Sequence, residues 1–133
     1  LLMTALGGML SNILFGGFAL VGYIATGWGD AVGEPVGTRW GKHRYRIPTF
    51  TGIKAYRSLE GSLAVCIASW IGCGLVLLLA LDVSFFSALW ISLVLSWITT
   101  LVEAVSLHSV DNLTIQIAAS GVCAWIFHLL GIT

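Results

Sequence analysis

The sequence predicts an all-α protein, a polytopic bundle of about four transmembrane helices with one polar loop. First, 58% of the 133 residues are apolar and only 9% are charged, whereas soluble domains carry about 25% charged residues. Second, the apolar residues form long runs near 2–27, 63–81, 84–102 and 113–131. Each run can cross the ~30 Å hydrocarbon layer as a helix. Third, these runs are continuous rather than alternating, which favours helices over a closed barrel.

The first run, 2–27, contains glycines that allow neighbouring helices to approach closely. It has no charged n-region and no cleavage site, so it is not interpreted as a signal peptide. We expect further helices upstream of Leu1, with the sequence forming the C-terminal part of a single transmembrane domain. The second and third runs are separated by a very short connection at Asp82. This spacing predicts an antiparallel helical hairpin.

The polar loop, residues 28–62, contains all six lysine and arginine residues of the chain. Short loops rich in these residues stay in the cytoplasm, so we expect this loop to be cytoplasmic. Counting the spans then places the Asp82 turn on the far side of the membrane, and the loop at 103–112 returns to the same face as the polar loop, with the C-terminus outside. Two polar segments that are far apart in the sequence are therefore predicted to meet at one surface.

Glycines recur at every fourth position of the polar loop, at Gly29, Gly33, Gly37 and Gly41. On a helix this spacing gives one bare stripe, and Asp30 and Glu34 lie on the adjoining stripe. Bare backbone beside two carboxylates suits a bound ligand and Mg²⁺, which prefers oxygen ligands and substrate phosphates. The alternative is helix packing on the glycines, with the two acids as solvated surface groups.

Pro35 interrupts this stripe, because proline in a helix interior breaks or kinks the helix. The segment is therefore predicted to form either two short helices or one kinked helix. A break would place a helix N-terminus near 36–38, where free N–H groups can hold phosphate.

The cations of the loop divide into two groups. Arg39 and Lys42, which are flanked by glycines, and the later pair Lys54 and Arg57 are interpreted as phosphate ligands. For Arg44 and Arg46, contact with lipid headgroups is an equal alternative. The sequence contains no nucleophile motif, so cations and carboxylates together indicate nucleotide chemistry, in which the protein positions groups and a metal bridges phosphates. Nucleic acid is not expected as a partner, because the basic loop is short and lies against a membrane.

Further polar residues stand where spans begin or end. Ser58 can cap the second span with Glu60 in its first turn, and Glu60 is also a site candidate. Glu103 and Asp111 are ionisable residues at span boundaries, which are costly and often functional. Asp111 and Asn112 could alternatively cap the fourth helix.

Three sequence elements, taken together, resemble the polyprenol kinase family, which includes dolichol, phytol and farnesol kinases. GDAVGEPVGTRWGKH, residues 29–43, resembles its GDA-x-A-x-x-x-G-x-x-x-G-K-H element. RSLEGSLA, residues 57–64, is similar to its K-S-x-E-G-S element, with Arg57 in place of lysine. VEA at 102–104 with DNLT at 111–114 resembles its third element. The chain departs from the family at Gln116, where proline is common, and in a longer loop at 44–56.

The resemblance implies a membrane kinase that uses CTP and a divalent metal to phosphorylate a lipid alcohol. It implies nucleotide-binding roles for Asp30, Gly37, Gly41, Lys42, Ser58, Glu60 and Gly61, and metal or catalytic roles for Glu103, Asp111 and Asn112. Placement of charge adds Arg39, Lys54 and Arg57 as nucleotide ligands, and Gly33 of the glycine stripe and Asn112 are further candidates. Asp30 is also a candidate catalytic residue. Asp30, Glu34 and Asp111 are the expected ligands of Mg²⁺, and Glu103 or Asp111 is the expected acceptor of the hydroxyl proton.

Two rival functions remain open at this point. A cytidylyltransferase similar to CDP-diacylglycerol synthase also joins CTP to a lipid, but the chain lacks its late acidic element with lysine. A non-catalytic membrane subunit or transporter would need charges inside the spans, where there are almost none. The lipid chain length, the nucleotide base, the type of membrane (bacterial inner membrane or plastid) and a homo-oligomeric state are also left open.

Overall fold

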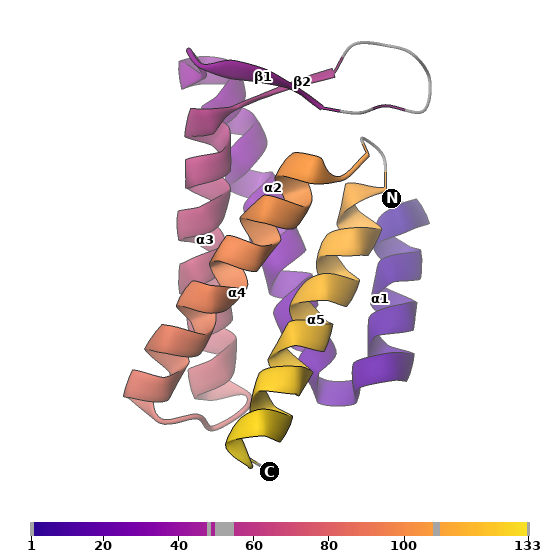
Figure 1. The fold of residues 1–133 in the computed structure, drawn as a ribbon, viewed down its shortest axis with the longest axis vertical. Helices are drawn as coiled ribbons and strands as arrows, with labels where there is room; N and C mark the ends of the chain where they lie inside the picture. The colour runs from indigo at the N-terminus through magenta and orange to yellow at the C-terminus, as the bar shows by residue number, and fades with distance from the viewer. Residues whose placement is uncertain (1, 48, 50–54, 108–109, 133) are drawn as a thin grey trace.

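The computed structural model describes residues 2–47, 49, 55–107 and 110–132 as a bundle of helices under a small β-hairpin (Figure 1). The elements are α1 (Leu2–Phe15), η1 (Gly16–Phe18), α2 (Ala19–Trp40), β1 (Arg44–Ile47), β2 (Ala55–Ser58), α3 (Leu59–Leu79), α4 (Phe85–Val105) and α5 (Asp111–Leu130). Within the described chain, four helical segments are long and apolar enough to cross a membrane, and Leu2–Trp40 counts as one of them. This confirms the predicted fold class.

The first predicted span, 2–27, is not one straight helix, because the chain reverses at Gly16–Phe18 (Figure 1). Thr4 of α1 contacts Asn112 at the start of α5, and Phe15 contacts Gly121 further along α5. In α2 the order is opposite, since the Phe18 ring just before α2 packs on Phe127 near the end of α5. Helices α1 and α2 are therefore antiparallel. Gly16 permits the turn with φ +55°, a left-handed conformation that costs glycine little.

Helix α2 continues through Pro35 as a single helix to Trp40. The predicted break, and with it a phosphate-binding helix N-terminus near 36–38, is absent from the structure. Thr38 donates its hydroxyl to the carbonyls of Glu34 and Pro35 at 2.9 and 3.1 Å. Residues 28–40, predicted as part of a loop, are thus the last turns of this helix.

The glycine stripe of α2 packs against α3. Gly33 faces Val65 and Gly61, and Gly37 lies against Ser58 and Gly61. Small residues on both helices let the two backbones approach closely, as is common in membrane bundles. The glycines therefore pack α2 against α3, and this packing fixes α2 beside the first turn of α3.

Gly33→Ala is expected to destabilise the bundle by about 1–3 kcal/mol, the usual cost of overpacking a core. A Cβ at Gly33 would lie 2.4 Å from Cγ2 of Val65, a short branched side chain with little freedom to move. Thermal unfolding in lipid nanodiscs measures the loss, and adding Val65→Ala should recover part of it. Gly27→Ala on the same helix is the control, because nothing lies within 4 Å of its Cβ. Equal stability of the Gly33 and Gly27 variants would contradict this packing.

Helices α3 and α4 form the antiparallel hairpin that the sequence predicts. The turn between them contains Asp82 with φ 55°, and Val83 donates its backbone N–H to the carbonyl of Leu77 at 2.9 Å. The core of the bundle consists of small and aliphatic side chains, such as Ala25, Leu95 and Ala119.

The polar loop also contains an antiparallel β-hairpin that the sequence analysis did not predict. Strand β1 pairs with β2 in the register Arg44 with Ser58 and Ile47 with Ala55. Strand β2 leads directly into α3, whose N-cap is Ser58, as predicted: its Oγ accepts the N–H of Gly61 at 3.1 Å. The strands lie across the polar end of the bundle (Figure 1).

Candidate active site

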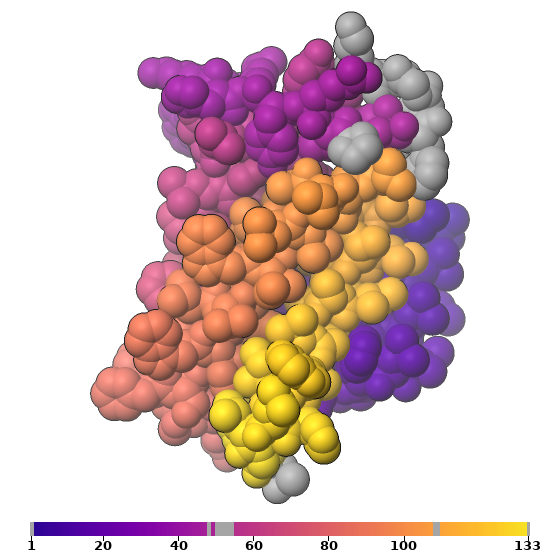
Figure 2. Space-filling view, in the orientation of Figure 1, coloured from indigo at the N-terminus to yellow at the C-terminus, as the bar shows by residue number. Residues whose placement is uncertain are grey.

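A cavity of about 480 Å³ lies between α2 and the β-hairpin at the polar end of the bundle. Helix α3 contributes its first turn, and α4 and α5 contribute the ends that face each other across their connection. Figure 2 shows the strands lying across the upper ends of α4 and α5. The charged and amide side chains that line the cavity are Asp30, Glu34, Arg44, Arg57, Glu103, Asp111 and Asn112. Both polar segments of the sequence thus meet here, as the topology predicts.

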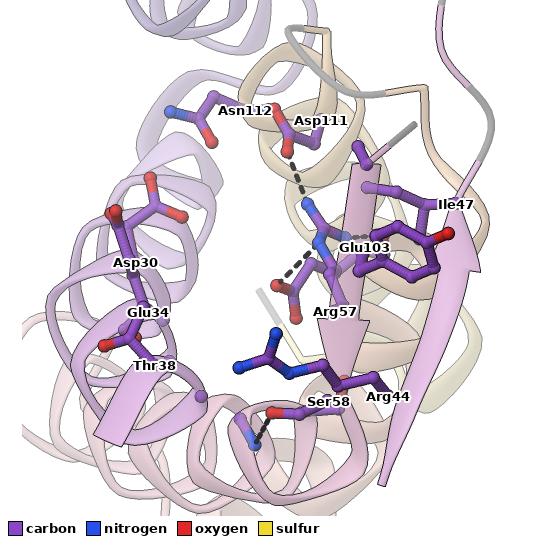
Figure 3. A pocket seen from close by; sticks show the side chains of 17 residues that line it. Asp30, Glu34, Thr38, Arg44, Ile47, Arg57, Ser58, Glu103, Asp111 and Asn112 are labelled. Carbon is purple, nitrogen blue, oxygen red and sulfur yellow. Dashed lines mark hydrogen bonds and ion pairs between the residues drawn. The ribbon is translucent and has the colours of Figure 1, made fainter. Parts of the chain in front are cut away.

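Arg57 of β2 joins the hairpin to α4 and α5. Its Nη2 lies 2.5 Å from Oδ2 of Asp111, and its Nε lies 3.6 Å from Oε1 of Glu103 (Figure 3). It also donates to the backbone carbonyl of Glu103. All three side chains are largely buried, with exposed fractions of 13–17%. One guanidinium therefore holds two carboxylates that are eight residues apart in sequence.

The first two residues of α5 form hydrogen bonds to β2 and to α1. Oδ1 of Asp111 accepts the backbone N–H of Asn112 at 3.0 Å, while Oδ2 accepts from Arg57. The Asn112 amide donates to the Thr4 hydroxyl of α1 at 3.0 Å, and Asn112 lies near Asp30, which also lines the cavity. Its side-chain oxygen faces the cavity (Figure 3).

Asp30 and Glu34 lie one turn apart on the face of α2 that borders the cavity (Figure 3). Both are exposed, and neither forms an ion pair with any residue that the structure describes. Asp30 is close enough to Asp111 and Glu103 for their charges to repel. The carboxylates of α2 therefore have no cationic partner among the described residues, whereas Glu103 and Asp111 pair with Arg57.

Glu103 differs from the other acids of the cavity. Its Oε1 pairs with Arg57, but its Oε2 is buried and has no hydrogen-bond partner among the described residues. A buried acceptor without a partner costs about 1–3 kcal/mol, so such atoms need an explanation. Oε2 is suited to accept a proton or a hydrogen bond from a bound substrate.

Two predicted phosphate ligands lie away from the cavity, and one cation that was not assigned lies inside it. Arg39 stacks on the Trp40 ring at 5.1 Å, and Lys42 is exposed and outside the lining. Arg44, which the sequence left equally open to lipid contact, lines the cavity (Figure 3). Pairing with Ser58 in the hairpin brings Arg44 there. Lys54 lies outside the described residues.

The remaining nucleotide-binding candidates have mainly structural contacts. Gly33, Gly37, Ser58 and Gly61 line the cavity at the seam between α2 and α3, and Gly41 packs on Ser58. Glu60 lies outside the cavity lining and pairs with the ring Nδ1 of His43 at 2.7 Å. This pair fixes the turn before β1 to the start of α3. Their nucleotide-binding roles stay predictions.

Among the described residues, no three carboxylate, histidine or cysteine side chains come together as a ready metal site. The predicted triad Asp30, Glu34 and Asp111 is thus not a preformed cage, although all three acids line one cavity. Mg²⁺ is usually held by one or two carboxylates and substrate phosphates rather than by a protein cage. The donor set fits a metal ion that arrives with a phosphate ligand.

Comparison with known proteins gives one informative match. Over 111 residues the chain is 32% identical to a phytol kinase from Synechocystis sp. (strain ATCC 27184 / PCC 6803 / Kazusa). This chain is a relative of that phytol kinase. The aligned region covers 81% of the chain and 43% of the relative, so the chain spans less than half the length of the enzyme it matches. The match supports the relationship to the polyprenol and phytol kinase family that the three motifs predict.

Two other comparisons returned nothing. No family model matches the chain, and no solved structure matches it. The four apolar helices, together with the kinase relative, indicate an integral membrane protein.

Several cavity residues were missed by the sequence analysis. Thr38, Ile47, Ala55, Tyr56 and Ser62 all line the cavity. The alternation in Arg-Tyr-Arg-Ile and Ala-Tyr-Arg-Ser is the signal that could have revealed the hairpin, and with it most of these residues. The density of charge in this segment obscured that pattern.

Proposed function

We propose that this chain transfers the terminal phosphoryl group of CTP to an isoprenoid alcohol such as phytol, at the membrane surface. One observation carries the proposal: carboxylates from α2, α4 and α5 face two arginines in a single cavity at the end of membrane-spanning helices. The similarity to a phytol kinase supports an isoprenoid alcohol as the acceptor. The abundance of lysine and arginine in residues 39–57 supports a cytoplasmic position of this end.

The charge of the cavity indicates that a nucleotide enters together with a cation. Four carboxylates and two guanidinium groups line it, so it carries more negative than positive charge when all are ionised. A triphosphate alone would be repelled by this excess. A divalent ion such as Mg²⁺ would be held by Asp30 and Asp111 and would neutralise phosphate charge when bound. Arg44 would contact the phosphates, and Arg57 would hold Asp111 in place for the ion.

The acceptor alcohol needs a base and a position beside the lipid. In the proposed step the alcohol oxygen attacks the γ-phosphorus, the bond to the bridging β–γ oxygen breaks, and CDP leaves. Glu103 takes the hydroxyl proton, because its Oε2 is buried and has no partner among the described residues. Asp111 is the weaker candidate for this role, since both its oxygens already accept hydrogen bonds.

Incubation of the purified chain in lipid nanodiscs with CTP labelled at the γ-phosphate tests the function. The proposal expects label in phytyl phosphate when phytol is present, and unlabelled CDP as the second product. Label in pyrophosphate would instead indicate the rival cytidylyltransferase. No nucleotide turnover with phytol, farnesol or a polyprenol would overturn the proposal. Replacing CTP by ATP or UTP in the same assay identifies the preferred donor.

Removal of divalent cations with EDTA is expected to abolish transfer, because the cavity's excess of negative charge then excludes the triphosphate. Excess Mg²⁺ should restore the activity, while the fold, followed by circular dichroism, stays unchanged. Full activity in EDTA would show that the cavity accepts the nucleotide without a cation.

A further inference from the structure

Helix α1 carries no charged residue. One of its side chains, Thr4, nevertheless contacts Asn112, a residue that lines the cavity. The Thr4 hydroxyl accepts the side-chain amide of Asn112 at 3.0 Å, across 108 positions of sequence. The Thr4 carbonyl accepts the side-chain amide of Gln116 at 3.1 Å. Thr4 thus contacts two side chains of α5 that lie about one turn apart.

The packing around Thr4 leaves little freedom for this contact. A Cβ on Gly7 would lie 2.9 Å from Cα of Leu113, so α1 and α5 touch almost backbone to backbone just below the cavity. Gln116 is buried and reaches the α1 backbone at the same level. The α1 start is therefore held against the first turn of α5.

The amide of Asn112 has two donors. One donates to Thr4, and the Asp30 carboxylate lies near the same amide. With its nitrogen engaged in this way, the side-chain oxygen faces the cavity (Figure 3). In the structure the Thr4 hydroxyl accepts from the amide nitrogen, which leaves the amide oxygen on the cavity side.

We propose that Thr4 is a positioning residue of the kinase site: its hydroxyl fixes the amide of Asn112, which presents its oxygen to the bound ligand. This inference rests on the proposed function. It adds to that function a residue outside the three sequence motifs. Thr4 does not line the cavity and touches no reacting group, so its effect passes through Asn112.

Thr4→Val tests the proposal, because valine keeps the shape of threonine and removes the hydroxyl. Loss of one hydrogen bond that aligns a charged site is expected to lower kcat/KM for CTP by about tenfold. Thr4→Ser, which restores a hydroxyl, should stay within about twofold of the unmodified chain. Ser11→Ala is the matched control, since Ser11 is a buried hydroxyl residue of α1 whose hydroxyl has no partner in the described structure.

A double-mutant cycle separates positioning from general damage to the bundle. If Thr4 acts through Asn112, then Thr4→Val should change kcat/KM by less than about twofold in a chain that already carries Asn112→Ala. An equal tenfold loss in both backgrounds would overturn the proposal, as would full activity of Thr4→Val alone. Should Asn112→Ala be too slow to assay, the same cycle is run on the dissociation constant of CTP with Mg²⁺. An inactive unmodified chain would instead count against the proposed function.

Discussion

Asp30→Asn is expected to lower phosphoryl transfer by at least about a hundredfold while leaving the fold intact. Asp30 would help to hold the Mg²⁺ that neutralises phosphate charge, and loss of electrostatic stabilisation of this kind commonly costs a factor of about 10²–10³ in kcat. Asp30 is exposed and forms no ion pair with a described residue. Asparagine therefore removes the charge with little effect on packing. Rates with labelled CTP and thermal unfolding in nanodiscs measure the two quantities.

Asp82→Asn is the matched control for this substitution. Asp82 lies in the α3–α4 turn, at the opposite end of the bundle, and its positive φ is tolerated by asparagine. It removes the same charge without touching the cavity, so activity should stay within about twofold. Unchanged transfer by the Asp30 variant would remove Asp30 from the site.

Arg57→Ala is expected to have the second large effect, on stability as well as on activity. The substitution leaves Glu103 and Asp111 largely buried without their shared cation. Breaking a buried pair by removing one partner costs about 3–5 kcal/mol, and the 16% exposure of Arg57 argues for the lower end of that range. Thermal unfolding should show the loss directly, and transfer should fall because Asp111 is no longer held.

Two further variants of the hairpin complete this test. Arg57→Lys keeps the charge but cannot span both acids with one planar group, so its loss should be intermediate. Arg46→Ala is the control on β1: Arg46 is exposed and lies outside the cavity lining, and substitutions of that kind usually stay within about 0.5 kcal/mol. An Arg57→Ala chain that unfolds like the unmodified protein would show that the hairpin is anchored in some other way.

The parts of the structure that depend on the bilayer were predictable from the sequence. Continuous apolar runs predict helices, because the backbone N–H and C=O groups of a segment in lipid must form hydrogen bonds within that segment. Counting those helices brings Glu103, Asp111 and Asn112 to the side of Asp30, where the structure places them. Arg57 was also identified, but as a phosphate ligand, whereas in the structure it pairs with the acids.

The parts that depend on contacts between distant residues were not predictable in this way. The chain reverses at Gly16–Phe18, within an apolar run that was predicted as one span. Hydropathy measures only how apolar a segment is, so it could not predict this change of direction. Arg44 lies in the cavity because it pairs with Ser58 across the two strands. The distribution of charge along the sequence contains no information about this strand pairing. Pro35 was expected to give either two short helices or one kinked helix, and the structure has a single helix, whose neighbouring glycines pack closely on α3.

Electron paramagnetic resonance of Mn²⁺, used in place of Mg²⁺, tests most directly whether acids from separate helices share one nucleotide. In the presence of CTP the unmodified chain in nanodiscs should bind Mn²⁺, and Asp30→Asn and Asp111→Asn should each weaken that binding by at least about tenfold. Asp82→Asn should bind as the unmodified chain does. Undiminished binding of Mn²⁺ with CTP by both site variants would contradict a nucleotide held between α2 and α5.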